Sequence, residues 1–449
     1  MMQMEIRTCF HRRGFGTAIL SAVSACSMSA LFADTDLQDR VTKWIRQRAL
    51  PVDGVSPDLP HRDLAPLKRV LADKQVVGIG ESNHGTSEYQ IFKHRLFRFL
   101  VQEMGFTAFA LESSYSSCRE IDDYVVKGTG RLEDVLTGQG YTVWDTLEMA
   151  ALLAWMRTYN QSARPEKKVR FFGLDISYNE RGRKNVLAWL QRYAPDRVST
   201  ADILLGAMGE EDSKWPGRTD HARVKTVLAD VQALAAFVRE LGRKLPTPTD
   251  PMEDAVWDMT VIEQWVVSNS GGVDRNDWMG RNLSRLLDRY PGMKVMASAF
   301  NNHIAHTPGT IGGIAKEKLG NNYYSLGAEF GAGSFRVRMR DPDKFFSKYR
   351  EITPAPAPEQ SVPWYLARSG KGSLLLDFEE PSTRKAVTDW IEKPQIMHNT
   401  SWAPALNDDT NYKPYNVPES YDGIYFIDQI RPARPTANGE VAARDRLRF

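Results

Sequence analysis

Acidic side chains and histidines follow four apolar runs of this sequence, at the point where each run ends. They are Glu81 and His84 after residues 75–80, Glu112 after 107–111, Asp175 after 169–174, and Asn301 with His303 after 294–300. A histidine near its usual pKa takes a proton from water at neutral pH, and an adjacent carboxylate orients its ring and stabilises the imidazolium. These residue types therefore predict general acid–base chemistry, with His84 as the base and Glu81 or Glu112 as its partner.

The runs that precede these residues have the length and composition of buried strands. The predicted strands cover residues 75–80, 107–111, 169–174, 294–300, 373–378 and 423–427. Amphipathic stretches lie between them, so the predicted fold class is α/β: a mixed, mostly parallel central sheet flanked by helices. The carboxyl ends of parallel strands meet along one edge, where open α/β folds bind their ligands. We therefore expect the polar residues to share one site.

Helical periodicity is clearest over residues 87–104, 147–159 and 224–241. Ser87 and Gln90 have the spacing of a capping box at the start of the first of these helices. Roughly residues 195–290 carry no clear strand, which predicts an inserted helical subdomain; ordinary surface helices over the sheet are the alternative. Gly80 and Gly85 would let the loop between them turn tightly and bring its backbone close to a ligand.

The amino-terminal segment has the pattern of an export signal. Three arginines up to Arg13 precede an uncharged, mostly apolar stretch, residues 15–33, so we expect a signal peptide over 1–33 and a periplasmic mature protein, 34–449. Arg12-Arg13 also fits a twin-arginine signal, and the residues before Cys26 resemble a lipoprotein signal. An uncleaved membrane anchor is a further alternative. No other segment has the length of a membrane span.

Composition excludes several classes of protein. The chain has 449 residues, and 58 basic against 56 acidic residues leave a net charge of +2, which does not favour nucleic acid as a partner. After removal of residues 1–33 only Cys118 remains, so no intramolecular disulfide can form. There is no G-x-S-x-G, H-E-x-x-H or paired-cysteine motif. We therefore expect no cofactor, and no motif predicts a bound metal.

Ordered blocks spread over the mature chain resemble the erythromycin esterase family. They are Gly80-Glu81-x-x-His84-Gly85-x-x-Glu88, Gly105-Phe106 with Glu112, residues 152–160, residues 169–175, Arg275 with Met279 and Asn282, and Asn301-Asn302-His303. The resemblance implies a carboxylic ester hydrolase with a mixed α/β core and helical additions, which opens a macrolide lactone without a metal.

The resemblance also implies roles for individual residues. His84 would activate water, Glu81 and Glu112 would support it, and Arg275 and His303 would bind or polarise the ester. The candidates for substrate binding are Glu88, Lys93, Asp175 and Asn301.

Two positions depart from the family pattern. The family often has histidine at the position of Phe300 and arginine at the position of Lys93. The lysine of this chain keeps the positive charge but cannot form the bidentate hydrogen bonds of a guanidinium. Both departures leave the natural ester substrate open.

Two other functions use the same residues. His84, Glu81, Glu88, Glu112 and His303 are all competent ligands for a divalent metal in a hydrolase that acts on another ester or an amide. Alternatively, the protein binds a small molecule in the periplasm without turnover. A chelator and a product assay distinguish these alternatives from the water-activating histidine.

Overall fold

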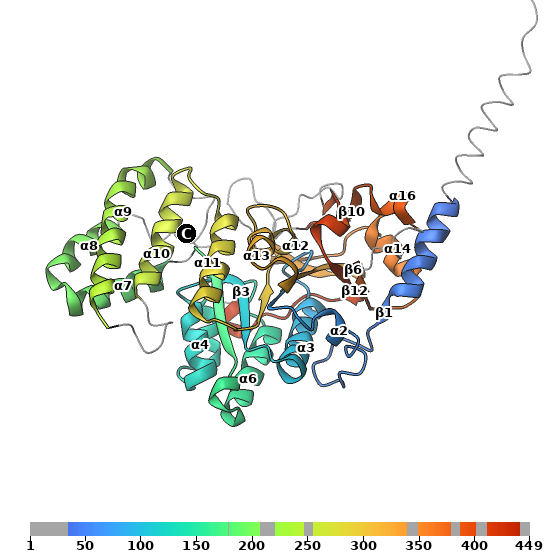
Figure 1. Ribbon diagram of the computed structural model, residues 1–449, viewed down its shortest axis with the longest axis horizontal. Helices are drawn as coiled ribbons and strands as arrows, with labels where there is room; N and C mark the ends of the chain where they lie inside the picture. Colours follow the sequence, from blue (N-terminus) through green and yellow to red (C-terminus); the bar gives the residue numbers. More distant parts are fainter. Residues whose placement is uncertain are drawn as a thin grey trace, which may run out of the picture.

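The computed structural model describes residues 35–177, 179–206, 221–246, 255–338, 349–378, 387–400 and 411–440 (Figure 1). The predicted signal peptide, residues 1–33, lies outside this part of the chain. Within it, no helix is long and apolar enough to cross a membrane.

An eight-stranded sheet with the order β1-β9-β12-β6-β2-β5-β3-β4 forms the centre of the molecule. Its strands are β1 (Leu50–Pro51), β2 (Val76–Ile79), β3 (Ala108–Ser114), β4 (Arg170–Asp175), β5 (Val295–Ser298), β6 (Tyr323–Gly333), β9 (Leu374–Asp377) and β12 (Gly423–Ile430). All neighbours from β4 to β12 pair in parallel, whereas β9 runs antiparallel to both β12 and β1. The prediction of a mixed, mostly parallel sheet is confirmed.

Each of the six predicted strands is present, but the longest strand was not predicted. Strand β6 pairs with β2 on one side and β12 on the other, so it lies at the centre of the sheet. Its glycines at 327, 331 and 333 dilute the apolar pattern, because glycine has no side chain to pack on a sheet. Two small hairpins, β7 (Phe335–Arg338) with β8 (Tyr349–Ile352) and β10 (Gln395–His398) with β11 (Tyr412–Tyr415), were also missed.

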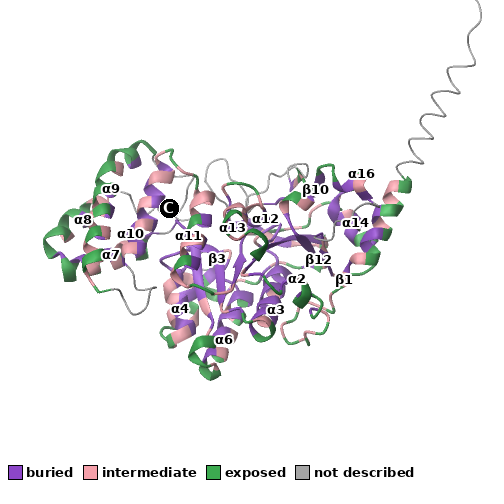
Figure 2. Ribbon diagram, in the orientation of Figure 1, coloured by how far each residue is buried: buried purple, intermediate pink, exposed green. Residues whose placement is uncertain are grey.

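Alternating side chains of the strands divide the core into two layers, since successive residues of a strand point to opposite faces. Val76 contributes to one apolar cluster and Val77 to the other, and Val295 and Met296 divide in the same way. One cluster includes residues of α3 (Ser87–Met104), α4 (Cys118–Lys127) and α6 (Leu147–Ser162). The other includes residues of α11 (Arg275–Arg289), α13 (Ile311–Leu319) and α14 (Val362–Arg368). Figure 2 shows the sheet buried between these layers.

The described residues between β4 and β5 are helical. They form α7 (Glu180–Tyr193), α8 (Val198–Gly206), α9 (His221–Lys244), α10 (Ala255–Asn269) and α11. Figure 1 shows α7 to α10 grouped to one side of the sheet, while α11 returns to pack against β4. Helix α11 therefore carries its first residue, Arg275, from the helical group to the carboxyl edge of the sheet.

The predicted capping box of α3 is wrong. Thr86 occupies the N-cap position without a side-chain cap. The Ser87 hydroxyl instead donates to Glu148 at 2.6 Å, and Gln90 accepts from the Thr146 hydroxyl at 2.5 Å. Tertiary partners on and next to α6 thus replace the local contacts that the sequence spacing suggested.

Asn160 connects three elements at the opposite, amino-terminal edge of β4. Its side chain is buried and makes hydrogen bonds to Val125 O (3.1 Å), to Val169 O (2.8 Å) and from Val169 N (2.7 Å). We expect Asn160→Ala to lower the free energy of unfolding by about 2–4 kcal/mol, because three buried partners lose their bonds. Urea unfolding measures the change. The exposed neighbour provides the control, since Gln161→Ala should change stability by less than about 0.5 kcal/mol.

Candidate active site

The carboxyl edge of the sheet brings most of the predicted site residues into one network. Glu81 and His84 follow β2, Glu112 lies near the end of β3, Asp175 ends β4, and His303 lies on the short helix α12 (Asn301–Ile304) after β5. Lys93 reaches the network from α3 and Arg275 from α11. Direct contacts and long-range charge interactions connect these seven residues.

Glu81 orients His84. Its Oε1 atom lies 2.5 Å from His84 Nδ1, and its Oε2 atom accepts a hydrogen bond of 2.5 Å from Lys93 Nζ. An ionised carboxylate can only accept a hydrogen bond, so we assign the Nδ1–H tautomer to His84. The Nε2 atom then carries the lone pair that can take a proton from water.

The pKa of His84 reflects opposing effects. Burial alone would lower it, but the hydrogen bond to Glu81 and the charges of Glu81 and Glu112 raise the pKa of His84 above its usual value. The His84 ring contacts the edge of Trp144, with centroids 5.4 Å apart, and lies 5.5 Å from the Phe300 ring. These two aromatic rings shield the imidazole and leave the carboxylates as its dominant electrostatic partners.

Glu112 binds a second set of partners, His303, Arg275 and the backbone of Phe300. Its Oε1 atom lies 3.2 Å from His303 Nε2 and accepts a 3.2 Å hydrogen bond from Arg275 Nη2, while its Oε2 atom accepts one of 3.0 Å from Phe300 N. Burial would raise the pKa of Glu112, but the charges of His303, His84 and Arg275 lower it well below its usual value. Glu112 is therefore ionised and fixes both a histidine and an arginine.

Asp175 directs the Arg275 side chain. It accepts hydrogen bonds from Arg275 Nε at 2.9 Å and Nη2 at 2.5 Å, and the Tyr141 hydroxyl also donates to it. Burial would lower the pKa of Arg275, but Asp175, Tyr141 and Glu112 raise it well above its usual value. The guanidinium stays charged, and its Nη1 group makes no hydrogen bond to any of the described residues.

The side chains of the network differ in how far they are buried. The side chains of Glu81 and Asp175 are fully buried and that of Glu112 is 7% exposed, whereas His84, His303 and Arg275 keep 11%, 14% and 22%. The two histidines and the arginine are therefore the more exposed members of the network, and the three carboxylates are its buried members.

The loop that carries His84 is held by three distant segments. Three successive carbonyl oxygens of the loop each accept one hydrogen bond. The donors are the Tyr425 hydroxyl to Gly80 O (2.7 Å), Asn301 N to Glu81 O (2.9 Å) and Thr400 N to Ser82 O (3.0 Å). A loop with its backbone groups paired in this way has one dominant conformation, so the base is preorganised.

Gly80 and Gly85 allow close contacts within the protein. A Cβ atom on Gly80 would lie 2.2 Å from Asn301 Oδ1, and one on Gly85 would lie 1.6 Å from Arg336 O. Neither glycine has a positive φ. We expected these glycines to let the backbone approach a ligand. Instead, they let it approach neighbouring segments of the protein, which explains why these positions need glycine.

Two of the predicted substrate-binding residues have their side chains engaged elsewhere. Glu88 accepts hydrogen bonds from Arg431 N at 2.6 Å and Arg431 Nε at 2.8 Å. Asn301 is paired with the backbone of Ala328 through both its amide nitrogen and its oxygen, at 2.9 Å each. The structure places Glu88 against the carboxyl-terminal segment and Asn301 between β5 and β6.

Sequence analysis missed Tyr141 and Trp144. Both lie in the loop between α5 (Leu132–Gly138) and α6, which carries no strand or motif to mark it. Trp144 Nε1 donates to Glu112 O at 3.1 Å, and its ring also lies 5.8 Å from Lys93 Nζ. Cys118 lies outside this network, and burial raises the pKa of its thiol to about 12, which suits a structural role.

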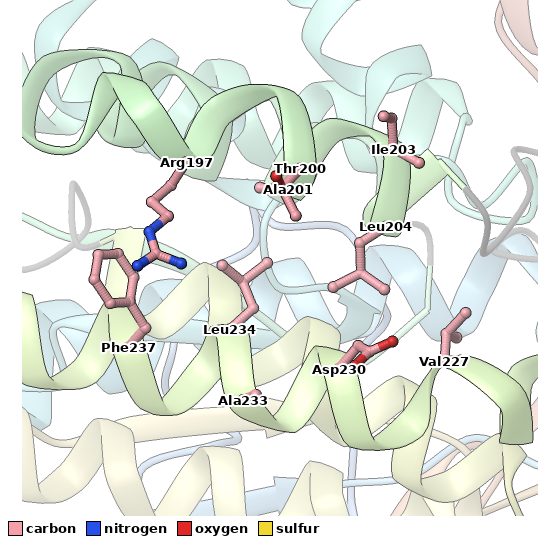
Figure 3. A pocket seen from close by; sticks show the side chains of 10 residues that line it. All are labelled: Arg197, Thr200, Ala201, Ile203, Leu204, Val227, Asp230, Ala233, Leu234 and Phe237. Atoms are coloured by element: carbon pink, nitrogen blue, oxygen red, sulfur yellow. The ribbon is translucent and has the colours of Figure 1, made fainter.

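Within the described ranges, no three His, Cys, Asp or Glu side chains are arranged to hold a metal ion. A cavity of about 610 Å³ lies between α8 and α9, with apolar walls from residues such as Leu204, Leu234 and Phe237 (Figure 3). It belongs to the helical group and contains none of the predicted site residues.

Known proteins resemble this chain in sequence. Residues 101–430 match the model of the erythromycin esterase family. Erythromycin esterase type II of Escherichia coli is 29% identical over 31% of this chain, and the match spans only about a third, 32%, of that relative's length. The putative hydrolase YbfO of Bacillus subtilis (strain 168) is 22% identical over 87% of this chain and 91% of its own length.

Solved structures share the fold. A succinoglycan biosynthesis protein has a TM-score of 0.76 and 22% identity, over 89% of this chain and 99% of that one. A mutant of the erythromycin esterase EreC in its open conformation has a TM-score of 0.65 and 17% identity, over 87% and 99%.

The fold is that of an α/β protein, and its candidate site is a network of histidines, carboxylates, Lys93 and Arg275 at the carboxyl edge of the sheet. Because the family model matches well over half of the sequence, the chain belongs to the erythromycin esterase family. Membership implies a hydrolase of the esterase type that acts on a small molecule.

The hydrogen bond to Glu81 can be tested through the titration of His84. We expect Glu81→Gln to lower the pKa of His84, because a neutral amide no longer stabilises the imidazolium. The sign follows from the raised pKa: the Glu81 interaction stabilises the protonated state, and this contribution disappears as the pH rises through that pKa.

Nuclear magnetic resonance of the imidazole carbons and nitrogens measures this titration. Glu240→Gln is the matched control, since Glu240 lies on the exposed surface of α9 and its removal should leave His84 unchanged. An unchanged or raised pKa of His84 in Glu81→Gln would contradict the assigned role of the carboxylate.

Proposed function

We propose that this protein opens a macrolide-type lactone with a water molecule that His84 activates. One observation carries the proposal: Glu81, itself paired with Lys93, engages Nδ1 of His84 and leaves Nε2 for a ligand, in the same network as Arg275 and His303 on Glu112. A base on one side and cationic donors on the other are the two requirements for adding water to an ester carbonyl.

The proposed reaction has two steps. His84 Nε2 takes a proton from water as the oxygen attacks the carbonyl carbon, which forms a tetrahedral oxyanion. The bond from this carbon to the ring oxygen then breaks, and the imidazolium returns the proton to the leaving oxygen. The product is an open-chain hydroxy acid, one water heavier than the lactone.

Arg275 and His303 would stabilise the oxyanion. Arg275 keeps its charge and has Nη1 available for a ligand, while Asp175 and Glu112 fix the other guanidinium nitrogens. A preorganised donor of this kind contributes about 3–4 kcal/mol to the stability of a transition state. The charge of Glu112 below them is the counterion that holds both groups in place.

Macrolide inactivation, and hence antibiotic resistance, is the biological role that the family name supports. The relatives named erythromycin esterase are distant, so the choice of a macrolide as substrate rests on family membership and on the site chemistry together. Phe300 and Trp144 beside His84 give the site an apolar wall, which suits the carbon-rich ring of such a lactone.

Mass spectrometry of erythromycin after incubation with the purified protein tests the proposal. We expect a product heavier by one water, formed faster as the pH rises through the raised pKa of His84, because only the neutral imidazole accepts a proton. His84→Ala should slow the reaction by about 10²–10⁴-fold, the usual contribution of a general base.

Two controls complete this experiment. His221→Ala removes an exposed histidine of α9 whose ring contacts Asn269 O and no residue of the network, so it should leave the rate unchanged. A parallel sample with EDTA should react at the same rate as the untreated protein. Loss of the product with EDTA would replace the proposal with a metal-dependent hydrolase on the same residues, and absence of product in every sample would reject the macrolide.

We also propose that the protein is exported to the periplasm, on the basis of the arginines and the uncharged stretch within residues 1–33. We expect the protein recovered from the periplasm to begin at or near Asp34, as intact mass and amino-terminal sequencing would measure. Replacing Arg12 and Arg13 by Lys distinguishes the export routes, because a twin-arginine signal depends on both side chains. A full-length chain in the cytoplasm would contradict export.

A further inference from the structure

The helix that carries His303 is too short to hold its own position. Helix α12 spans Asn301–Ile304, a single turn, and its N-cap residue Phe300 makes no side-chain cap. One turn of helix is unfavourable by itself, because several backbone angles are fixed for one hydrogen bond. Contacts from other segments must therefore set the place of His303.

Two residues of this turn, Asn301 and His303, are held by contacts to the sheet and to the site. Asn301 is bound through its side chain to Ala328 of β6 and through its N–H group to Glu81 O. His303 itself lies 3.2 Å from Glu112. These contacts fix the first residue of the turn and the tip of the catalytic side chain, but not the residue between them.

The last residue of the turn, Ile304, accepts hydrogen bonds through its carbonyl from the Tyr323 hydroxyl at 2.6 Å and the Ser325 hydroxyl at 2.7 Å. Tyr415 of β11 supplies the contact to the residue before His303. Its hydroxyl donates a hydrogen bond to Asn302 Oδ1, on the residue directly before His303. The same hydroxyl accepts a 2.6 Å hydrogen bond from Asn399 Nδ2. Burial raises the pKa of Tyr415, so the hydroxyl keeps its proton and remains a donor to Asn302.

The hairpin that carries Tyr415, formed by β10 and β11, is firmly anchored. His398 at the end of β10 is buried, with Nδ1 2.6 Å from Glu329 Oε2 and its N–H group donating to Glu329 Oε1 at 2.9 Å. The His398 ring stacks on Phe330, with centroids 4.0 Å apart. Both partners belong to β6, so the hairpin is fixed to the central strand.

The hairpin touches both loops of the site. Thr400 N donates to Ser82 O at 3.0 Å, and Ser82 is next to Glu81 in the sequence. Tyr415 touches Asn302, next to His303. The β10–β11 pair thus contacts both the segment of His84 and the segment of His303, which are also joined directly by the hydrogen bond from Asn301 N to Glu81 O.

We propose that Tyr415 is a positioning residue for His303, and that the β10–β11 hairpin, together with the hydrogen bond from Asn301 N to Glu81 O, holds His303 relative to His84. The catalytic consequence rests on the proposed function; the placement of His303 does not. Without the Tyr415 hydroxyl, Asn302 loses this contact, and the imidazole of the next residue, His303, samples a wider range of positions.

Tyr415→Phe removes this hydroxyl and keeps the ring. Tyr421 provides a matched control: its ring centroid lies 6.3 Å from that of Tyr415, and its buried hydroxyl has no hydrogen-bond partner among the described residues. The chemical change in Tyr421→Phe is therefore identical, but no contact to the site is lost.

Imidazole resonances of His303 give a readout that needs no substrate. We expect Tyr415→Phe to shift or broaden them, while Tyr421→Phe leaves them as in the unmodified protein. With erythromycin as substrate, we expect Tyr415→Phe to lower kcat by about 10–100-fold, the scale of a misplaced catalytic group, with KM within about twofold. Asn302→Ala should reproduce both effects, and the double variant should add nothing further, because both changes break one contact.

Unchanged His303 resonances in Tyr415→Phe, or the same change in both tyrosine variants, would overturn the proposal. If the unmodified protein hydrolyses no macrolide, the proposed function fails, and the resonances still decide whether Tyr415 positions His303. A change confined to Tyr415→Phe and Asn302→Ala supports the proposal in either case.

Discussion

Three carboxylates buried at one edge of the sheet impose the main constraint on this structure. Glu81, Glu112 and Asp175 lie under the site with little or no exposure. An unpaired buried charge costs several kcal/mol, so each must have cationic or hydrogen-bonding partners within the same small volume. Lys93 and Arg275 are placed where they are because these carboxylates require them.

The pairing leaves a few polar atoms unused, and these are the atoms available for chemistry. Glu81 engages Nδ1 of His84 and leaves Nε2 without a hydrogen bond to the described residues, while Asp175 and Glu112 engage two guanidinium nitrogens of Arg275 and leave the third. The same contacts that make burial of the carboxylates tolerable also orient the base and the cation. Stability and chemistry at this edge therefore depend on one set of hydrogen bonds.

Much of this arrangement could be predicted from the sequence. A polar residue directly after an apolar run is a local pattern. A parallel sheet gathers the carboxyl ends of its strands at one edge, so the grouping of Glu81, Glu112 and Asp175 could be expected from the parallel arrangement alone. Glu88 shows the limit. It has the residue type and spacing of a site residue, yet its carboxylate binds Arg431, which lies 343 positions away. No local pattern carries information about such a partner.

The sequence by itself determined the strands, their polar ends and the residue types that can carry protons, because these depend on periodicity and composition over a few neighbours. Only the tertiary structure decided which polar groups meet. It inserted the unpredicted β6 into the middle of the sheet, placed Trp144 against His84, and brought the hydroxyl of Tyr415 to Asn302. These contacts join segments far apart in the chain, and their positions are set by packing around a shared core rather than by any local preference.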